Sequence, residues 1–174
     1  MNNYLDWTNE QIEDLINRVY GGVVSQSNLP EDLFEAILFK LSEAIIEGFG
    51  GVEEGTNYAD LEAKFQANVQ RFSYGKTFHL ISEMRSNLVD SEGNKLSFSD
   101  FKKEAKKHFD IYNGKWLKTE FNTAYNVAQR SSDFVRYMNE AEGLPLLKYD
   151  TVGDGKVRAS HRKLDGIVKP VHDP

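Results

Sequence analysis

The sequence contains no cysteine among its 174 residues. This absence excludes disulfide scaffolds, thiolate zinc sites and cysteine nucleophiles within these residues, and it suits a reducing compartment. No uncharged apolar run approaches the length of a membrane span, and the first residues, MNNYLDWTNEQ, lack the basic start and apolar stretch of a signal peptide. We therefore expect a soluble, cytoplasmic protein that has no contact with a membrane.

The common catalytic motifs are absent as well. The sequence has no Gly-x-Ser-x-Gly elbow and no P-loop, so we predict a protein that is not an enzyme and needs neither a cofactor nor a small-molecule substrate. Acidic residues number 27 against 21 Lys and Arg, which gives a net charge of −6. This charge disfavours a protein whose main task is to coat nucleic acid, although a local basic face remains compatible with it.

Hydrophobic residues make up 40% of the chain, enough for a core, and their spacing over residues 1–143 is typical of helices. The apolar stripe of one predicted helix is Ile12, Leu15, Ile16 and Val19, and that of a later one is Phe98, Phe101, Ala105, Phe109 and Tyr112. A capping box formed by Thr8 and Gln11 predicts one helix start, and Gly21-Gly22 predicts the end of that helix. Pro30 begins a second helix. The apolar surface of this helix widens at Phe39 and Ile46, so we expect it to be the central helix of a bundle.

Two further helical patterns follow, and each contains a predicted interruption. The pattern from Asn57 to about Leu88 has a glycine at position 75, where we expect a kink or break. A second capping box, Ser97 with Asp100, begins the next helix. Asn113-Gly114 predicts a break, after which a helix resumes and runs to Gly143.

The character of the sequence changes after Leu144-Pro145. The segments LLKYDTV and GIVKPV are typical of strands, and residues 144–174 carry a net charge of +2, which leaves −8 on residues 1–143. We predict a mainly α fold: an N-terminal helical bundle followed by a small α+β C-terminal unit with a short β-hairpin. The predicted regions are 1–95, which is helical, and 96–174, with long helices over 97–143 and a small β-rich unit over 144–174.

The stretch YDTVGDGKVRASHRKLDG, residues 149–166, is a candidate site. A calcium loop that begins at Asp150 fails at position 3, which is Val152, and at position 12, which is His161. Asp154-Gly155 predicts a hairpin turn.

Histidine and aspartate side chains in the same stretch suggest further roles. His161 and His172 lie near several aspartates, but their spacing matches no metal template. We expect His161 to anchor the turn through hydrogen bonds to the backbone or to a neighbouring carboxylate, and Arg158 to pair with Asp154 or Asp150. Val157 and Ile167 are expected to pack.

Two histidines in the helical region have glutamate at a spacing of four residues, in the pairs His79 with Glu83 and Glu104 with His108. Neither pair matches the spacing of di-iron bundles, so we interpret both as ordinary surface pairs. The segment FKKEAKKHF presents a basic helix face with two interpretations, a solvated surface relieved by Glu104 or a contact with DNA phosphates or an acidic partner. Its lysines are Lys102, Lys103, Lys106 and Lys107.

The C-terminal third resembles the phage Mu protein F-like family of minor head, or head-morphogenesis, proteins. The segment KTEFNTAYNVAQ (Lys118–Gln129) is similar to that family's Thr-Glu-x-Asn-x-Ala-Tyr-Asn helix through Glu120, Asn122, Tyr125 and Asn126. The segment Tyr149–Pro174 is similar to a second family stretch, whose spaced positions are Thr151, Asp154, Val157, Arg158, His161, Leu164, Gly166 and Pro170. The resemblance covers roughly the last 60 residues, and the combination of spaced positions is fairly specific.

The resemblance implies a structural protein present in few copies, found in the bacterial host cytoplasm during assembly and then in the virion head. Its implied partners are the portal and other head proteins, with phage DNA as an additional partner. Members of that family continue past Asp-Pro into a cysteine-containing ending. The chain is therefore either a truncated form of a longer protein, which we favour, or a natural short form. The truncated form leaves open a metal site shared between His161 and downstream cysteines.

Two other functions compete with this one. The first is a DNA-contacting virion protein that uses the face from Lys102 to Lys107 together with the basic tail, residues 144–174 with their net charge of +2. The second is a metal-dependent hydrolase-like site around His161, with Asp154 and Arg158.

Overall fold

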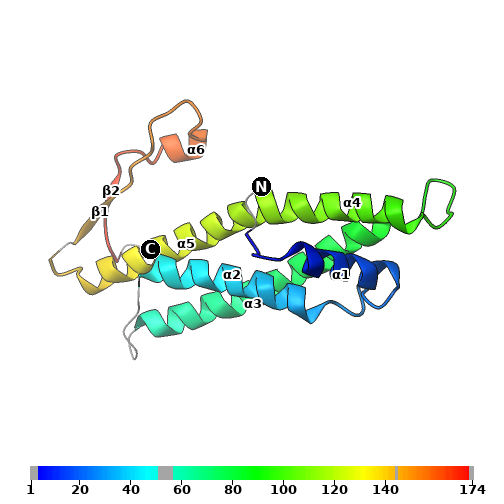
Figure 1. The fold of residues 1–174 in the computed structure, drawn as a ribbon. Coiled ribbons are helices and arrows are strands. Elements are labelled where there is room, and N and C mark those ends of the chain that lie inside the picture. The colour runs from blue at the N-terminus through cyan, green and yellow to red at the C-terminus, as the bar shows by residue number, and fades with distance from the viewer. Residues whose placement is uncertain (1–3, 51–56, 144, 173–174) are drawn as a thin grey trace. The chain divides into compact units, whose positions relative to one another are not determined.

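The computed structural model describes residues 4–50, 57–143 and 145–172 (Figure 1). The chain is mainly helical with a small two-stranded antiparallel sheet, which confirms the predicted fold class. It divides into two compact units, residues 1–129 and 130–174. The predicted family-like region 96–174 therefore contributes residues to both units.

The first unit is built from helices that pack side by side. Its elements are α1 (Asn9–Tyr20), α2 (Glu31–Phe49), α3 (Asn57–Ser86), α4 (Phe98–Ile111), the π-helical segment η1 (Tyr112–Trp116) and the N-terminal part of α5 (Leu117–Asn139). Helix α3 packs against α1, α2 and α4, so α3 holds the central place that the sequence predicted for α2. The apolar arc of α2 is partly uncovered, since Phe39 and Ile46 are 63% and 53% exposed.

Side-chain caps determine where two of these helices begin. The hydroxyl of Thr8 accepts the backbone N–H of Gln11 at 3.2 Å, and the side chain of Gln11 accepts the N–H of Thr8 at 2.8 Å, which confirms the first capping box. Ser97 caps α4 by accepting the N–H of Asp100 at 3.2 Å. In a full capping box the Asp100 carboxylate would accept the backbone N–H of Ser97. Here it accepts the hydroxyl of Ser97, at 2.6 Å.

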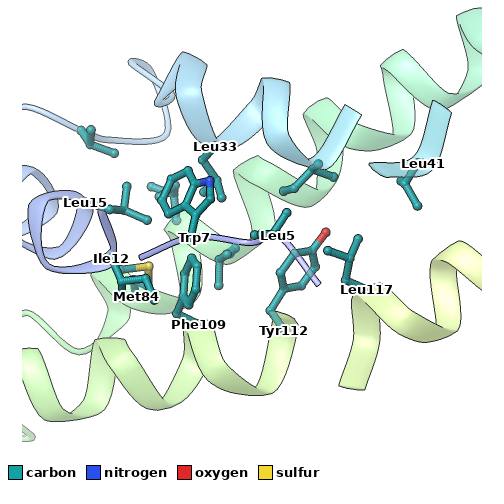
Figure 2. Close-up of a cluster of buried hydrophobic side chains, with 14 of the residues drawn as sticks. Leu5, Trp7, Ile12, Leu15, Leu33, Leu41, Met84, Phe109, Tyr112 and Leu117 are labelled. Carbon is teal, nitrogen blue, oxygen red and sulfur yellow. The ribbon is translucent and has the colours of Figure 1, made fainter. Parts of the chain in front are cut away.

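The predicted apolar stripes meet in one core (Figure 2). Trp7, which precedes α1, stacks on Phe109 of α4 with ring centroids 5.7 Å apart. Each stripe of α1 and α4 is buried on the predicted positions, apart from the half-buried Phe98; the buried residues are Ile12, Leu15, Ile16, Val19, Phe101, Ala105, Phe109 and Tyr112. Burial of side chains of this size supplies most of the stability of such a unit.

Both predicted helix interruptions are wrong. Helix α3 runs through Gly75 without a break. At Asn113-Gly114 the chain stays helical through η1, because tertiary contacts outweigh the weak local preference of these two residues. The buried side-chain oxygen of Asn113 accepts the backbone N–H of Leu5 at 2.8 Å, and Tyr112 and Leu117 on either side are buried in the core.

The second unit contains the C-terminal part of α5, a hairpin of β1 (Leu146–Lys148) and β2 (Val168–Pro170), and the short helix α6 (Ala159–Arg162). Leu147 pairs with Lys169 in the antiparallel register, which confirms the hairpin. Asp154-Gly155 does not form the hairpin turn that we predicted, because residues 149–167, including α6, link the strands. The positive φ in the first part of this link belongs to Gly153, at 68°.

Helix α2 touches α5 most closely at Gly48. A Cβ atom there would lie 2.5 Å from the carbonyl oxygen of Tyr125 and 2.7 Å from the Cβ of Ala128. We expect Gly48→Ala to force the helices apart and to lower the free energy of unfolding by about 1–3 kcal/mol, measured by urea denaturation. The matched control is Gly75→Ala in α3, where no atom lies within 4 Å. This control should gain about 0.5–1 kcal/mol from helix propensity; equal effects of the two substitutions would contradict the close approach.

Candidate functional site

Six lysines line one open hollow of about 780 Å³ on the continuous helix formed by α4, η1 and α5. Four of them are the predicted basic face, Lys102, Lys103, Lys106 and Lys107. Sequence reasoning missed Lys115 and Lys118, because it placed a break between them and α4. Since η1 carries the helix through Gly114, these two residues extend the same face; we call the six lysines the basic stripe.

The basic stripe is only partly neutralised. Lys102 forms an ion pair with Glu13 of α1, Lys106 with Asp110 at 3.1 Å, and Lys107 with Glu104 at 3.6 Å. Within the described parts of the chain, the other three lysines form no ion pair; they are Lys103, Lys115 and Lys118. The stripe therefore has a positive potential although the chain as a whole is acidic.

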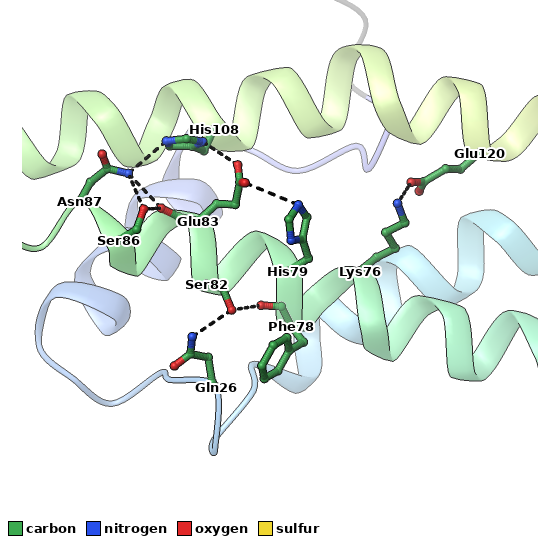
Figure 3. Close-up of polar contacts among 10 residues, drawn as sticks. All are labelled: Gln26, Lys76, Phe78, His79, Ser82, Glu83, Ser86, Asn87, His108 and Glu120. Carbon is green, nitrogen blue, oxygen red and sulfur yellow. Dashed lines mark hydrogen bonds and ion pairs between the residues drawn. The ribbon is translucent and has the colours of Figure 1, made fainter.

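A second site lies between α2, α3 and α5, where an apolar groove of about 470 Å³ ends at an ion pair. Lys76 of α3 contacts Glu120 of α5 at 2.6 Å (Figure 3). Glu120 also accepts the hydroxyl of Tyr112 at 3.3 Å. Burial, aided by the Glu120 charge, raises the pKa of Tyr112 well above its ordinary value, so this hydroxyl stays protonated and donates. Glu120, a residue of the family-like helix, thus holds α5 against α3.

The histidines of α3 and α4 meet at one carboxylate (Figure 3). Glu83 contacts Nε2 of His79 at 3.5 Å, as predicted, and Nδ1 of His108 at 3.1 Å. The predicted pair of Glu104 with His108 is wrong, because His108 reaches across to the C-terminal end of α3. There its Nε2 lies 3.0 Å from the side-chain amide nitrogen of Asn87, the residue that follows the helix. Within the described residues, no group of three or more His, Asp or Glu side chains could hold a metal ion. This cluster fastens two helices together.

Residues 149–167, which link β1 to β2, are held by two contacts near the hairpin. Asp165 accepts the backbone N–H of Thr151 at 2.8 Å and its hydroxyl at 2.9 Å. The hydroxyl of Tyr149 lies 3.0 Å from Nδ1 of His161, so His161 anchors this segment, but through a tyrosine hydroxyl and not through the predicted backbone or carboxylate partner. The contact of Thr151 with Asp165 joins the two ends of the link, and that of Tyr149 with His161 joins its start to α6.

The predicted salt bridge of Arg158 with an aspartate is wrong. Asp150 forms an ion pair with Lys148 at 3.2 Å, and the carboxylate of Asp154 accepts the backbone N–H of Lys156 at 2.9 Å. Arg158 precedes the first residue of α6, and the described part of the chain gives it no ion pair. Ile167, expected to pack, is 41% exposed.

The remaining residues of the family-like motifs lie in different environments. Tyr125 and Val157 are half-buried. The others are exposed and belong to α5, the link or β2; they are Asn122, Asn126, Leu164, Gly166 and Pro170. The two motifs fall in different units, since Lys118–Gln129 belongs to the first and Tyr149–Pro174 to the second.

Sequence reasoning also missed an apolar surface in the second unit. Arg130, Phe134 and Tyr137 of α5 line a hollow of about 560 Å³ together with residues of the hairpin and the link, including Leu147 and Leu164. Val171 is the one buried apolar residue among those described in this unit. The unit therefore leaves most of its apolar side chains uncovered.

Comparison with known proteins does not assign the chain to a group: no family model, curated protein or solved structure matches it. Over the residues described, none of the helices combines the length and hydrophobicity that crossing a bilayer requires.

The pair of Lys76 and Glu120 should contribute to stability, because the side chain of Glu120 is only 12% exposed. We expect Lys76→Met to leave that carboxylate without its cation and to lower the free energy of unfolding by about 1–3 kcal/mol. The triple variant Lys76→Met/Tyr112→Phe/Glu120→Leu, which also removes the hydroxyl that Glu120 accepts, should recover most of the loss. Arg136→Met, which breaks an exposed pair with Asp133, is the control and should change stability by less than about 0.5 kcal/mol. Equal losses of stability in Lys76→Met and Arg136→Met would contradict the larger contribution of the pair with the mostly buried Glu120.

The contact between Thr151 and Asp165 has a signature in pH titration. The backbone N–H of Thr151, followed by its hydroxyl, lowers the pKa of Asp165. Because this pKa is lower in the folded than in the unfolded state, the contact stabilises the link fully at a pH above the unfolded-state pKa. This stabilisation is lost as the pH falls through the folded-state pKa. In an NMR titration we expect Thr151→Val to raise the pKa of Asp165. Asp90, whose pKa is lowered by hydrogen bonds within its own turn, is the internal control and should not move; an unchanged Asp165 would contradict the contact.

Proposed function

We propose that this chain is a structural minor head protein of a phage or prophage, which acts in capsid assembly or in DNA packaging and delivery by contacting portal or coat proteins. Two segments support the proposal through their resemblance to the Mu F-like family, Lys118–Gln129 and Tyr149–Pro174. The observation that carries it is the uncovered apolar surface of residues 130–174.

The residues of the family-like segments have contacts that suit a structural role. Glu120 is held by Lys76, Thr151 by Asp165, and His161 by Tyr149. Each contact ties together two segments of the chain that are at least 12 residues apart in sequence. These residues therefore serve to hold the shape of the two units.

The apolar surface supports the contact with other proteins. Leu146 and Val168 of the hairpin are 58% and 52% exposed, and Phe134 of α5 is 51% exposed. Clustered exposed side chains of this kind mark protein interaction sites, because their burial against a partner is favourable. Portal and coat proteins are the partners that the resemblance implies.

The proposal is tested by co-expressing the chain with the portal and coat proteins encoded beside it and measuring co-purification. We expect Leu146→Asp/Val168→Asp to reduce the bound fraction by at least about tenfold, since charges would replace apolar contacts. The control is Val23→Asp/Ile46→Asp in the first unit, where the side chains are 61% and 53% exposed. This control should bind like the unaltered chain. The proposal fails if neither protein binds the unaltered chain, or if both double variants bind equally well.

A further inference from the structure

The basic stripe has a composition that indicates what it recognises. All of its six cations are lysine, and the hollow that they line contains neither arginine nor an aromatic side chain. We propose that the stripe binds the phosphate backbone of double-stranded DNA without reading its base sequence. This inference goes beyond the protein contacts proposed above and does not depend on them.

The length of the stripe suits a duplex. Lys102 and Lys118 are the two ends of the stripe within one helical run, and at about 1.5 Å per residue they lie about 24 Å apart along the axis. Phosphates follow one another every 3.4 Å or so along a strand, so the stripe faces about seven of them. A lysine occurs on each successive turn except at Ile111, which gives evenly spread charge along the backbone.

The choice of lysine favours binding that does not depend on base sequence. Arginine holds the edge of guanine, a carboxylate or a phosphate through two parallel hydrogen bonds, whereas lysine acts as a mobile point charge that suits contacts with a uniform backbone. A surface that reads bases would be expected to contain at least one arginine. The absence of aromatic side chains from the hollow favours a duplex over a single strand, because single strands are bound largely by stacking of bases on aromatic rings.

Charges within the stripe and around it both favour a bound polyanion. The pairs Lys102 with Lys106 and Lys103 with Lys107 are like charges four residues apart, which destabilise a helix by a few tenths of a kcal/mol each. Phosphates would relieve this repulsion. Residues 1–143 carry a net charge of −8, which repels DNA from the other faces of the helical region, so a duplex would approach along the stripe. Asp110, which also lines the hollow, opposes binding.

The test measures the affinity of the whole chain for a duplex of about 20 base pairs, two helical turns, by fluorescence anisotropy. Lys102 and Lys106 are held in ion pairs, so we count about four phosphate contacts, from the three lysines without an ion pair and from Lys107, whose pair with Glu104 is long at 3.6 Å. With about four contacts, the affinity should fall about 100-fold between roughly 50 and 200 mM salt. Lys103→Gln/Lys107→Gln/Lys118→Gln should weaken binding and reduce the slope of log affinity against log salt by about 3. Asp110→Asn should strengthen binding.

Two controls separate the stripe from total charge. Lys64→Gln/Lys156→Gln/Lys163→Gln makes the same change of charge outside the stripe, two of its sites being in the basic tail, and should leave the salt slope unchanged. Asp133→Asn is the control for Asp110→Asn and should leave affinity unchanged. Circular dichroism checks that every variant folds.

The following results would overturn the inference. They are a shallow salt dependence of the unaltered chain, equal losses in the two lysine triple variants, stronger binding of single-stranded DNA than of duplex, and competition by polyglutamate as effective as that by DNA. The last result would assign the stripe to an acidic protein surface.

Discussion

The first unit depends on a helix that does not break. Asn113 and Gly114 both favour a helix end, yet η1 carries the chain from α4 into α5. The buried amide oxygen of Asn113 accepts the N–H of Leu5, and Tyr112 and Leu117 enter the core on either side. An unmade hydrogen bond at a buried N–H is costly, so this contact and the burial around it hold the π-helical turn in place.

Two sites follow from that continuity. Glu120 reaches Lys76 and Tyr112 because α5 leaves η1 along the side of α3 and α2, where Gly48 allows the closest approach. On the open side of the same helix, Lys115 and Lys118 line one hollow with the lysines of α4. One face of the run thus builds the core, while the other presents charge. The second unit has little core and offers apolar side chains instead.

Sequence patterns predicted the elements whose signals are local. The Thr8 cap and the stripe of α1 were predicted, because each depends on spacing over a few residues. The hairpin was also predicted, but its turn was placed wrongly at Asp154-Gly155, because residues 149–167 link the paired strands. The breaks at Gly75 and Asn113 were predicted wrongly, since distant contacts such as that with Leu5 decide them. The same error hid Lys115 and Lys118 from the basic face. The partner of His108 was also missed, because Glu83 lies on another helix.

The continuous helix is tested most directly by a distance across it. Because the chain has no cysteine, Lys103→Cys/Thr123→Cys can be spin-labelled at those two positions alone and measured by double electron–electron resonance. A continuous helix predicts a single narrow distribution near 30 Å, from twenty residues at about 1.5 Å each. A break at Asn113-Gly114 that folded α5 back along α4 would give a distance below about 20 Å, within twice the usual spacing of packed helices, and would contradict the account.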